Sequence, residues 1–600
     1  MSHPTSTSWK DRLIQHRAPI LRWVQGLSFG LSLFSVGLIL FFYGFPHDPE
    51  EQSLIVRAIL SLFAFYALLF VTRALLARRF GAFLKENWKE FLLMLLLSVD
   101  SISVLVSNAP FFLGFLGRTL GFDLTRFYLL FIQGYLLLFV VLDLAQLSEL
   151  VSKLNIRPAT LLAGSFILLI FLGSMILMMP EMTVQAGSMD FLPALFTATS
   201  ASCVTGLIVV DTATYFTFAG KLVIMLLFQL GGLGIITFTV FFSLFLRSGI
   251  GLKSQLAMKE LLNSSNLVST QGTLRKVISY TLIFELIGGM LIYLFWRDSY
   301  FADMQEKIFF VAFHAISAFC NAGFSLFSEG LMHRSTIHNY PLQLVIAGLI
   351  FFGGLGFPVL QDLFGIENLR RRMRYPWLRW EITTRIALFA SLALLVFGAV
   401  MFFALERSRL AHQSATGQVV TALFQSITTR TAGFNTVAVE ALQTPTLIIF
   451  LFLMFVGASS ASTGGGIKTS TFVVLFKAVF SVIQGKQNMN IGKRTISPDT
   501  LNKAYAVFLF ATSFIFTAVF LLTITDGHVP IMNLVFEEVS AFCTVGLSTG
   551  ITADLSPAGQ FIIIVSMFVG RVGILTLALA LSTISNPDKF RYPRAQLIIG

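Results

Sequence analysis

Charged residues are scarce in this chain, and their scarcity argues against a water-soluble protein. Asp, Glu, Lys and Arg together make up 12% of the 600 residues, whereas soluble domains carry about 25%. Hydrophobic residues make up 56%, and the mean hydropathy is +0.81. The first long apolar run, Val24 to Phe45, covers about 22 residues, which suits a bilayer crossing better than a cleaved signal peptide. We therefore expect an all-α polytopic membrane protein.

The sequence also has few cysteines and shows no group of residues typical of an active site. The three cysteines, Cys203, Cys320 and Cys543, form no disulfide pattern of a secreted protein. They share a local context, but no His, Asp or Glu recurs beside them to complete a site for a soft metal. No cluster of His, Asp and Glu resembles an active site. We therefore expect neither enzymatic activity nor a cofactor in this chain.

The surplus of basic residues predicts membrane orientation rather than a nucleic-acid partner. The net charge of +12 is carried by short loops between apolar runs, and alternate loops such as 47–51 are acidic or mixed. Because Lys and Arg are enriched on the cytoplasmic side, we expect both termini in the cytoplasm. The basic segments are 10–22, 73–89, 247–259, 370–379, 486–503 and 589–594.

Apolar runs of spanning length recur along the chain and predict roughly twelve crossings. An even number of crossings fits two termini on the same side of the membrane. The runs begin near Val24, Ser53, Glu90, Phe127, Ala159, Phe216, Arg275, Pro341, Ile382, Thr446, Leu501 and Gly559.

Four shorter apolar segments, too short to span, each end in a polar turn that contains a glycine. They are FTATSASCVTGL (196–207), FHAISAFCNAGF (313–324), FQSITTRTAGF (424–434) and FEEVSAFCTVGL (536–547). Their glycines, Gly206, Gly323, Gly433 and Gly546, are separated by 117, 110 and 113 residues. Three copies have Phe ten, Ser six and Cys three residues before the glycine. The third copy is one residue shorter and has Arg430 in the Cys position.

A second cluster of small residues follows each turn, inside the next apolar run. The clusters are QLGGLGIITF (229–238), FFGGLGFPVL (351–360), FVGASSASTGGGIKTST (455–471) and FVGRVGILTL (568–577). We therefore expect four helix–pore-loop–helix repeats around a pseudo-fourfold pore, preceded by four extra N-terminal helices. The predicted boundaries are 1–155 for the N-terminal extension and 156–260, 261–375, 376–495 and 496–600 for the four repeats.

A polar glycine turn at membrane depth indicates a pore. Irregular backbone is tolerated there only when it is buried in protein or lines a water-filled cavity. Inward-facing carbonyls can replace the hydration shell of a cation, and Gly reaches positive φ without a Cβ penalty. The predicted selectivity filter comprises Cys203, Val204, Thr205, Gly206, Cys320, Asn321, Ala322, Gly323, Arg430, Thr431, Ala432, Gly433, Cys543, Thr544, Val545 and Gly546. Within it, the ion is expected at Val204, Thr205, Asn321, Ala322, Thr431, Ala432, Thr544 and Val545.

The four loops CVTGL, CNAGF, TRTAGF and CTVGL, together with GASSASTGGGIKTST, resemble the Trk/Ktr/HKT superfamily of potassium transporters over about residues 158–590. The resemblance implies a bacterial Ktr/Trk-type membrane subunit that takes up potassium across the cytoplasmic membrane. It also implies a homodimer that works with a cytosolic nucleotide-binding regulatory subunit. Family members with Ser in the first loop tend towards sodium, so Gly206 favours potassium. The N-terminal extension departs from the compact form of the family, and its role stays open.

The small-residue cluster of the third repeat predicts a gate. Three consecutive glycines and several hydroxyls in SSASTGGGIKTS (459–470) make a poor helix in the middle of a span. A tolerated kink is the plainer alternative. Arg571 supports the gate, because a charge inside a span is costly and by default functional; the resemblance likewise implies an intramembrane loop and a pore-facing Arg. The predicted gate residues are Ser459, Ser462, Thr463, Gly464, Gly465, Gly466, Lys468 and Arg571.

Three further interpretations concern charge and transport mode. Arg430 is expected to fix its loop structurally, with Glu537 or Glu538 as a salt-bridge partner. A voltage sensor is disfavoured, because the fourth apolar run (127–147) lacks regularly spaced Arg.

A secondary active transporter with alternating access is the alternative function. Parallel repeats favour a pore, and whether flux follows the potassium gradient would separate the two.

Overall fold

The computed structural model describes residues 17–75, 158–245, 270–486, 488–492 and 494–581, with isolated positions between 81 and 103. Their regular secondary structure is helical, as predicted, apart from one short hairpin of β1 (Asn490–Ile491) and β2 (Arg494–Thr495). The predicted spans near Glu90 and Phe127 lie largely outside the described residues. Both chain ends and the basic loop 247–259 lie outside them too.

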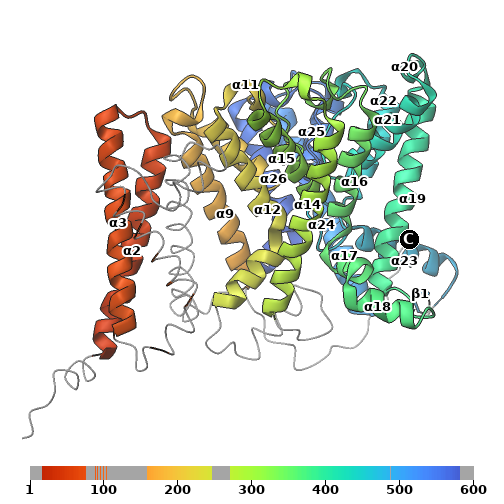
Figure 1. Ribbon diagram of the computed structural model, residues 1–600. Helices are drawn as coiled ribbons and strands as arrows, with labels where there is room; N and C mark the ends of the chain where they lie inside the picture. The colour runs from red at the N-terminus through yellow and green to blue at the C-terminus, as the bar shows by residue number, and fades with distance from the viewer. Residues whose placement is uncertain are drawn as a thin grey trace, which may run out of the picture.

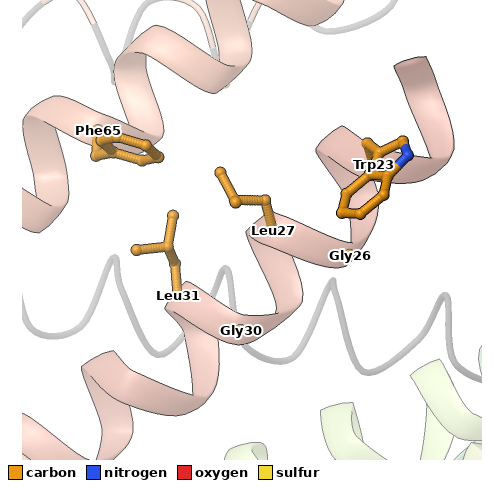
Figure 2. A pocket seen from close by; sticks show the side chains of 6 residues that line it. All are labelled: Trp23, Gly26, Leu27, Gly30, Leu31 and Phe65. Atoms are coloured by element: carbon orange, nitrogen blue, oxygen red, sulfur yellow. The ribbon is translucent and has the colours of Figure 1, made fainter.

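The N-terminal extension contributes two described helices, α2 (Arg17–Gly44) and α3 (Pro49–Leu75), which stand side by side at one edge of the molecule (Figure 1). Pro49 at the first helical position and two glutamates in the first turn favour the start of α3. The hydroxyls of Ser32 and Tyr66 join the two helices through a buried hydrogen bond of 2.8 Å. A groove of about 620 Å³ runs along the pair (Figure 2), lined by Trp23, Gly26, Leu27, Gly30, Leu31 and Phe65.

Each of the four repeats begins with a long apolar helix and continues with a short one. The long helices are α9 (Pro158–Leu177), α14 (Thr270–Phe295), α19 (Ile382–Leu405) and α24 (Pro498–Thr525). The short helices are α10 (Phe191–Ser202), α15 (Met304–Cys320), α21 (Ala415–Thr428) and α25 (Ile531–Phe542). Single-turn helices α11 (Thr212–Tyr215) and α20 (Arg407–Leu410) lie in connecting loops.

The third element of each repeat is a broken helix rather than a straight span. Its parts are α12 (Phe218–Phe245); α16 (Tyr340–Leu355) with α17 (Phe357–Phe364) and α18 (Ile366–Arg374); α22 (Thr444–Phe455) with α23 (Thr469–Ile483); and α26 (Pro557–Val572) with α27 (Ile574–Leu581). Glycines with positive φ mark three of the breaks: Gly234 at 55°, Gly356 at 88° and Gly573 at 87°. At Gly356 the chain turns by 105° between α16 and α17. The third repeat is interrupted by a longer non-helical segment, 456–468.

These breaks explain why few helices pass as simple spans. Among the described residues, five helices are long and apolar enough to cross a membrane, or six if the bent pair α16–α17 counts as one. Four of the five are the first helices of the repeats, and the fifth lies in α2. From the sequence, a break is predicted in the third repeat only, because a glycine inside an apolar run is also compatible with an uninterrupted helix.

The repeats are packed in a closed cycle. Elements of the first repeat (α12) contact the second (α14 and α15), and α16 of the second contacts α19 and α21 of the third. In turn α22 and α23 contact α25 and α24 of the fourth repeat, whose α26 and α27 return to α9 and α10 of the first. The short helices and their loops therefore face one another near the middle of the molecule.

Candidate functional site: a ring of four glycine loops

The residues that follow each short helix adopt the same unusual backbone in all four repeats. The residue two positions before each glycine, and the glycine itself, have positive φ in every case. The non-glycine members are Val204 (57°), Asn321 (58°), Thr431 (78°) and Thr544 (50°), and the glycines are Gly206 (90°), Gly323 (73°), Gly433 (75°) and Gly546 (89°). Positive φ is strained for a β-branched residue such as Val204. We call the segments 203–206, 320–323, 430–433 and 543–546 the ring loops.

Hydrogen bonds to the preceding helix hold this strained backbone. The residue before each loop glycine donates its N–H to a carbonyl of the last helical turns: Thr205 to Ser200 (2.8 Å), Ala322 to Ser317 (2.7 Å), Ala432 to Thr428 (3.0 Å) and Val545 to Ser540 (2.8 Å). The hydroxyls of the same four helix residues bond a second time. Ser200 and Ser540 accept from the glycine N–H, and Ser317 and Thr428 donate to the carbonyl that follows the glycine. This is the structural role of the recurring Ser that the sequence revealed without explaining.

The loops meet their neighbours in a closed ring. A Cβ added to Gly206 would lie 2.5 Å from the carbonyl oxygen of Ala322 in the next repeat. A Cβ added to Gly323 would lie 2.7 Å from the oxygen of Ala432, and one on Gly433 would lie 2.5 Å from that of Val545. Gly546 completes the cycle against the oxygen of Thr205. Glycine is required at all four positions both by its φ and by this close approach.

Side chains of the ring loops point into protein rather than to solvent. Within the residues that the structure describes, the ring-loop positions before each glycine are buried, with Arg430 at the limit at 9% exposure. The Asn321 amide and the Thr431 hydroxyl are hydrogen-bonded at 3.2 Å and join two neighbouring loops. The Cys320 thiol donates to Gln229 of α12 at 3.2 Å and so lies behind its loop. At their glycines, the loops meet one another through backbone atoms.

In the first, second and fourth repeats, a glycine of the second cluster allows the broken helix to approach the end of a short helix. A Cβ on Gly231, Gly353 or Gly570 would collide with the carbonyl oxygen of Ser202, Phe319 or Phe542 respectively. Each of these oxygens belongs to the residue just before a ring loop. The second cluster is thus a packing surface for the loops, a role that sequence reasoning left unassigned.

The non-helical segment 456–468 lies directly against the ring loops. Gly464 touches the Thr431 side chain, and the Gly465 N–H donates to the Thr544 hydroxyl at 2.9 Å. The Ser459 and Thr463 N–H groups donate to carbonyls of the second repeat, Gly354 and Gly353, at 2.9 and 3.4 Å. Lys468 turns back onto its own segment, donating to the Gly464 carbonyl at 2.5 Å. Ser462 has a buried hydroxyl with no hydrogen-bond partner among the described residues.

Arg571, in the last turn of α26, contacts the same segment. Its guanidinium donates to the carbonyl oxygen of Thr463 in the segment and to that of Gly231 in the first repeat. The side chain is 5% exposed. No acidic group pairs with it in the described part of the chain, so its charge is met by backbone oxygens only. Segment 456–468 thus bonds directly to the second and fourth repeats, and Arg571 links it to the first.

The predicted salt bridge of Arg430 is wrong. Arg430 donates to the carbonyl and hydroxyl oxygens of Ser391, both at 3.2 Å, and to the Gly457 carbonyl at 3.3 Å. In the described residues no ion pair joins it to Glu537 or Glu538. The guanidinium points outward from the ring to α19, because repeat three lacks the cysteine packing found in the others and its larger side chain must fill the space behind the loop.

The profile of the TrkH cation transport protein family matches residues 158–592, which contain the whole ring and segment 456–468. The chain belongs to the TrkH family. It is 39% identical to the Ktr system potassium uptake protein B of Vibrio alginolyticus over 442 residues, covering 72% of this chain and 94% of that protein. The protein of the same name from Bacillus subtilis (strain 168) is 37% identical over 458 residues, with 76% and 99% covered. The resemblance seen in the loop motifs is therefore confirmed.

The fold of the TrkH family is found again in a solved structure. The potassium transporter TrkH from Vibrio parahaemolyticus aligns with a TM-score of 0.56 at 16% identity, covering 88% of this chain and 98% of that one. At this identity the match supports the fold alone.

Proposed function

We propose that this chain takes up potassium across the cytoplasmic membrane through a selectivity filter made of the four ring loops. The observation that carries the proposal is the closed cycle in which each loop glycine meets a backbone carbonyl of the next repeat. Such a ring supplies oxygens from four loops around one axis, and backbone oxygens can replace the hydration shell of a monovalent cation. The potassium uptake named for both Ktr relatives favours potassium, as does Gly206 in the first loop.

The filter proposal assigns the ion to backbone rather than side-chain ligands. Potassium would be held at the predicted positions Val204, Thr205, Asn321, Ala322, Thr431, Ala432, Thr544 and Val545. Their side chains are buried against protein, which leaves the carbonyls as ligands. The cysteines and Arg430 would act behind the loops and not on the ion.

Uptake is tested in cells that lack their own high-affinity potassium systems. Expression of the chain should restore growth at low potassium, and reconstituted vesicles should accumulate potassium in preference to sodium. A correctly inserted chain that restores no growth and moves no potassium would contradict the proposal. Flux that follows the potassium gradient alone would support a pore over alternating access.

We also propose that segment 456–468 and Arg571 form the gate. The segment contains Gly464, Gly465 and Gly466, which disfavour regular helix. Its bonds to the Thr544 hydroxyl of a ring loop and to Arg571 support a position beside the filter, where a change in backbone could open or close the path.

We propose that the chain forms a homodimer in the cytoplasmic membrane. Both termini would be cytoplasmic, and a cytosolic nucleotide-binding subunit would be attached. Basic loops are the suggested contacts, and segments 370–379 and 486–503 are the ones that fall in the described residues. Mild-detergent extraction from native membranes should recover two copies of the chain with a second polypeptide. Recovery of this chain alone would count against the partner.

A further inference from the structure

A polar residue stands at one equivalent position in all four short helices, directly after the buried Phe that begins each repeat motif. The four residues are Thr197, His314, Gln425 and Glu537, which follow Phe196, Phe313, Phe424 and Phe536. All four are buried, with at most 2% of their surface exposed. A buried polar side chain is costly unless it is hydrogen-bonded, so each position calls for a partner.

Three of the four find that partner in the segment that leaves the ring loop. His314 Nε2 is hydrogen-bonded to the Ser325 hydroxyl at 3.2 Å, two residues beyond the loop glycine. Gln425 Nε2 donates to the Thr436 hydroxyl at 3.0 Å, three residues beyond it. In the fourth repeat, Glu537 accepts from the hydroxyl of Ser548 at 3.0 Å.

The fourth repeat has a second bond at the same carboxyl group. Thr552 also donates its hydroxyl to Glu537. The fourth loop is therefore held by two hydroxyl bonds, where the second and third loops each have one.

In the second repeat, the position of the proton on His314 determines which group donates in the bond to Ser325. His314 Nδ1 lies 2.8 Å from the Phe310 carbonyl oxygen, so this nitrogen carries the proton and donates. In the neutral ring Nε2 is then an acceptor, and the Ser325 hydroxyl donates to it. Each of the three bonds thus joins the short helix to the chain beyond the glycine and encloses the ring loop between two fixed ends.

The first repeat has no such bond among the described residues. The residues two and three positions beyond Gly206 are Ile208 and Val209, which offer no side-chain partner. The Thr197 hydroxyl has no hydrogen-bond partner in the part of the chain that the structure describes. The first ring loop therefore relies on the Ser200 bonds.

We propose that His314, Gln425 and Glu537 are positioning residues that tie the far end of their ring loops to the short helices, and that they set ion selectivity through the loop backbone. The inference rests on the proposed filter. The loop carbonyls discriminate ions only while their positions are held, and strained positive-φ backbone persists only where its surroundings fix it. The untied first loop is the most compliant of the four.

The test uses the full chain in vesicles and compares Glu537→Gln with Glu537→Met. An amide can accept from Ser548 and donate to Thr552, so Glu537→Gln should keep most of the potassium-to-sodium uptake ratio. Methionine keeps the length of the side chain and loses both hydroxyl bonds, so the ratio should fall about tenfold, as expected for the loss of roughly one hydrogen bond. The double variant Ser548→Ala, Thr552→Val should reproduce the methionine result.

Thr197→Val is the matched control, because it changes the same repeat position where no tie is described, and it should leave the ratio unchanged. Thr436→Val removes the hydrogen bond between Gln425 and Thr436 in the third repeat. It provides the test of the proposal if Glu537→Met fails to fold. The proposal would be refuted by a normal potassium-to-sodium uptake ratio in both Glu537→Met and Thr436→Val. Equal losses of this ratio in Glu537→Gln and Glu537→Met would also refute it. A wild-type chain without potassium preference would instead refute the filter itself.

Discussion

Gly433 lies so close to the carbonyl oxygen of Val545 that a Cβ on it would stand 2.5 Å from that oxygen. The two residues belong to neighbouring repeats more than a hundred positions apart in the sequence. Neither can retreat easily, because the Val545 N–H is bonded to Ser540 and Gly433 has a φ of 75°. The width of the ring is therefore set by backbone contact between repeats, and any side chain at a loop glycine must widen or distort it.

The first prediction follows from this contact. Gly206→Ser places a Cβ 2.5 Å from the Ala322 carbonyl oxygen at a φ of 90°, which must displace backbone. We expect the potassium-to-sodium uptake ratio to fall by about tenfold, the effect of losing roughly one well-placed ligand interaction. Gly348→Ser is the control, since a Cβ at that helical glycine meets nothing within 4 Å. Unchanged relative uptake of the two ions in a well-inserted Gly206→Ser chain would contradict the filter.

The second prediction concerns Arg430 and its partners in α19 and segment 456–468. Arg430→Met leaves the carbonyls of Ser391 and Gly457 without their donor. Each buried group that loses its partner costs about 1–3 kcal/mol, so the thermal unfolding temperature in detergent should drop clearly. Ser391→Ala loses only the hydroxyl bond and should cause a smaller drop. Equal stability of Arg430→Met and the wild type would show that these bonds do not hold the loop.

Much of this arrangement could be predicted from the sequence, for reasons that differ from residue to residue. The near-constant spacing of Gly206, Gly323, Gly433 and Gly546 identified the repeats, because only a recurring backbone demand explains glycine at one fixed place. The short helices before them were also predicted, since their apolar stretches cannot span. Helix bounds differ only modestly from the predicted starts; α14, for example, begins at Thr270 and not near Arg275.

What the sequence could not supply was contact between repeats. Glu537 and Glu538 were expected beside Arg430 because charge complementarity was the only available criterion. In the structure Arg430 points to α19, and Glu537 bonds hydroxyls within its own repeat. The polar residue after each Phe was visible in all four motifs, and their alignment could have found the ties. The breaks at Gly234, Gly356 and Gly573 left no signal distinct from ordinary small-residue packing.

The third prediction is a pH dependence of stability centred on Asp526, in the loop after α24. Burial alone would raise the pKa of Asp526, but hydrogen bonds from Ser556 and Thr525, with His528 nearby, lower it below its usual value. A lowered folded-state pKa contributes stability above the unfolded pKa of about 4, and that contribution is lost as pH falls through the folded pKa. Asp526→Asn should therefore be less stable than the wild type at pH 7, by about 1–3 kcal/mol.

The same difference should shrink as unfolding is measured at decreasing pH, towards about pH 3. Asp554→Asn is the matched control, because Asp554 is exposed in the following loop. A stability gap for Asp526→Asn that stays constant over this pH range would argue against the carboxylate as its source.

The fourth prediction is that deletion of residues 1–150 leaves a chain that still takes up potassium. All four ring loops and segment 456–468 lie beyond the deletion, and the family match begins at residue 158. Within the described residues, the deletion removes the packing of Gly44 against Met179, which lies at the periphery of the first repeat. Uptake per inserted molecule should remain within about twofold of the full chain, a difference of less than about 1 kcal/mol in barrier height. Loss of uptake at normal membrane levels would show that the extension takes part in the pore.

The last prediction concerns Arg571, whose guanidinium joins segment 456–468 to the first repeat. The segment has three consecutive glycines and no helix to unwind, so its backbone can change conformation at low cost. The Arg571 bonds to Thr463 and Gly231 oppose that change, and in the proposed gate its buried charge would raise the barrier for a passing cation. Arg571→Ala removes both effects and should raise cation flux several-fold. Selectivity should be kept, because the ring-loop contacts between repeats do not involve Arg571.

Arg571→Lys provides the comparison that separates charge from bonding. Lysine keeps the positive charge but cannot reach two separate carbonyls with a planar fork. If the bonds hold the segment, Arg571→Lys should also raise flux; if charge alone is the barrier, it should conduct like the wild type. Flux is measured as potassium and sodium uptake into vesicles with matched protein content. Lower flux in a well-folded Arg571→Ala chain, or altered selectivity at unchanged flux, would refute the gate.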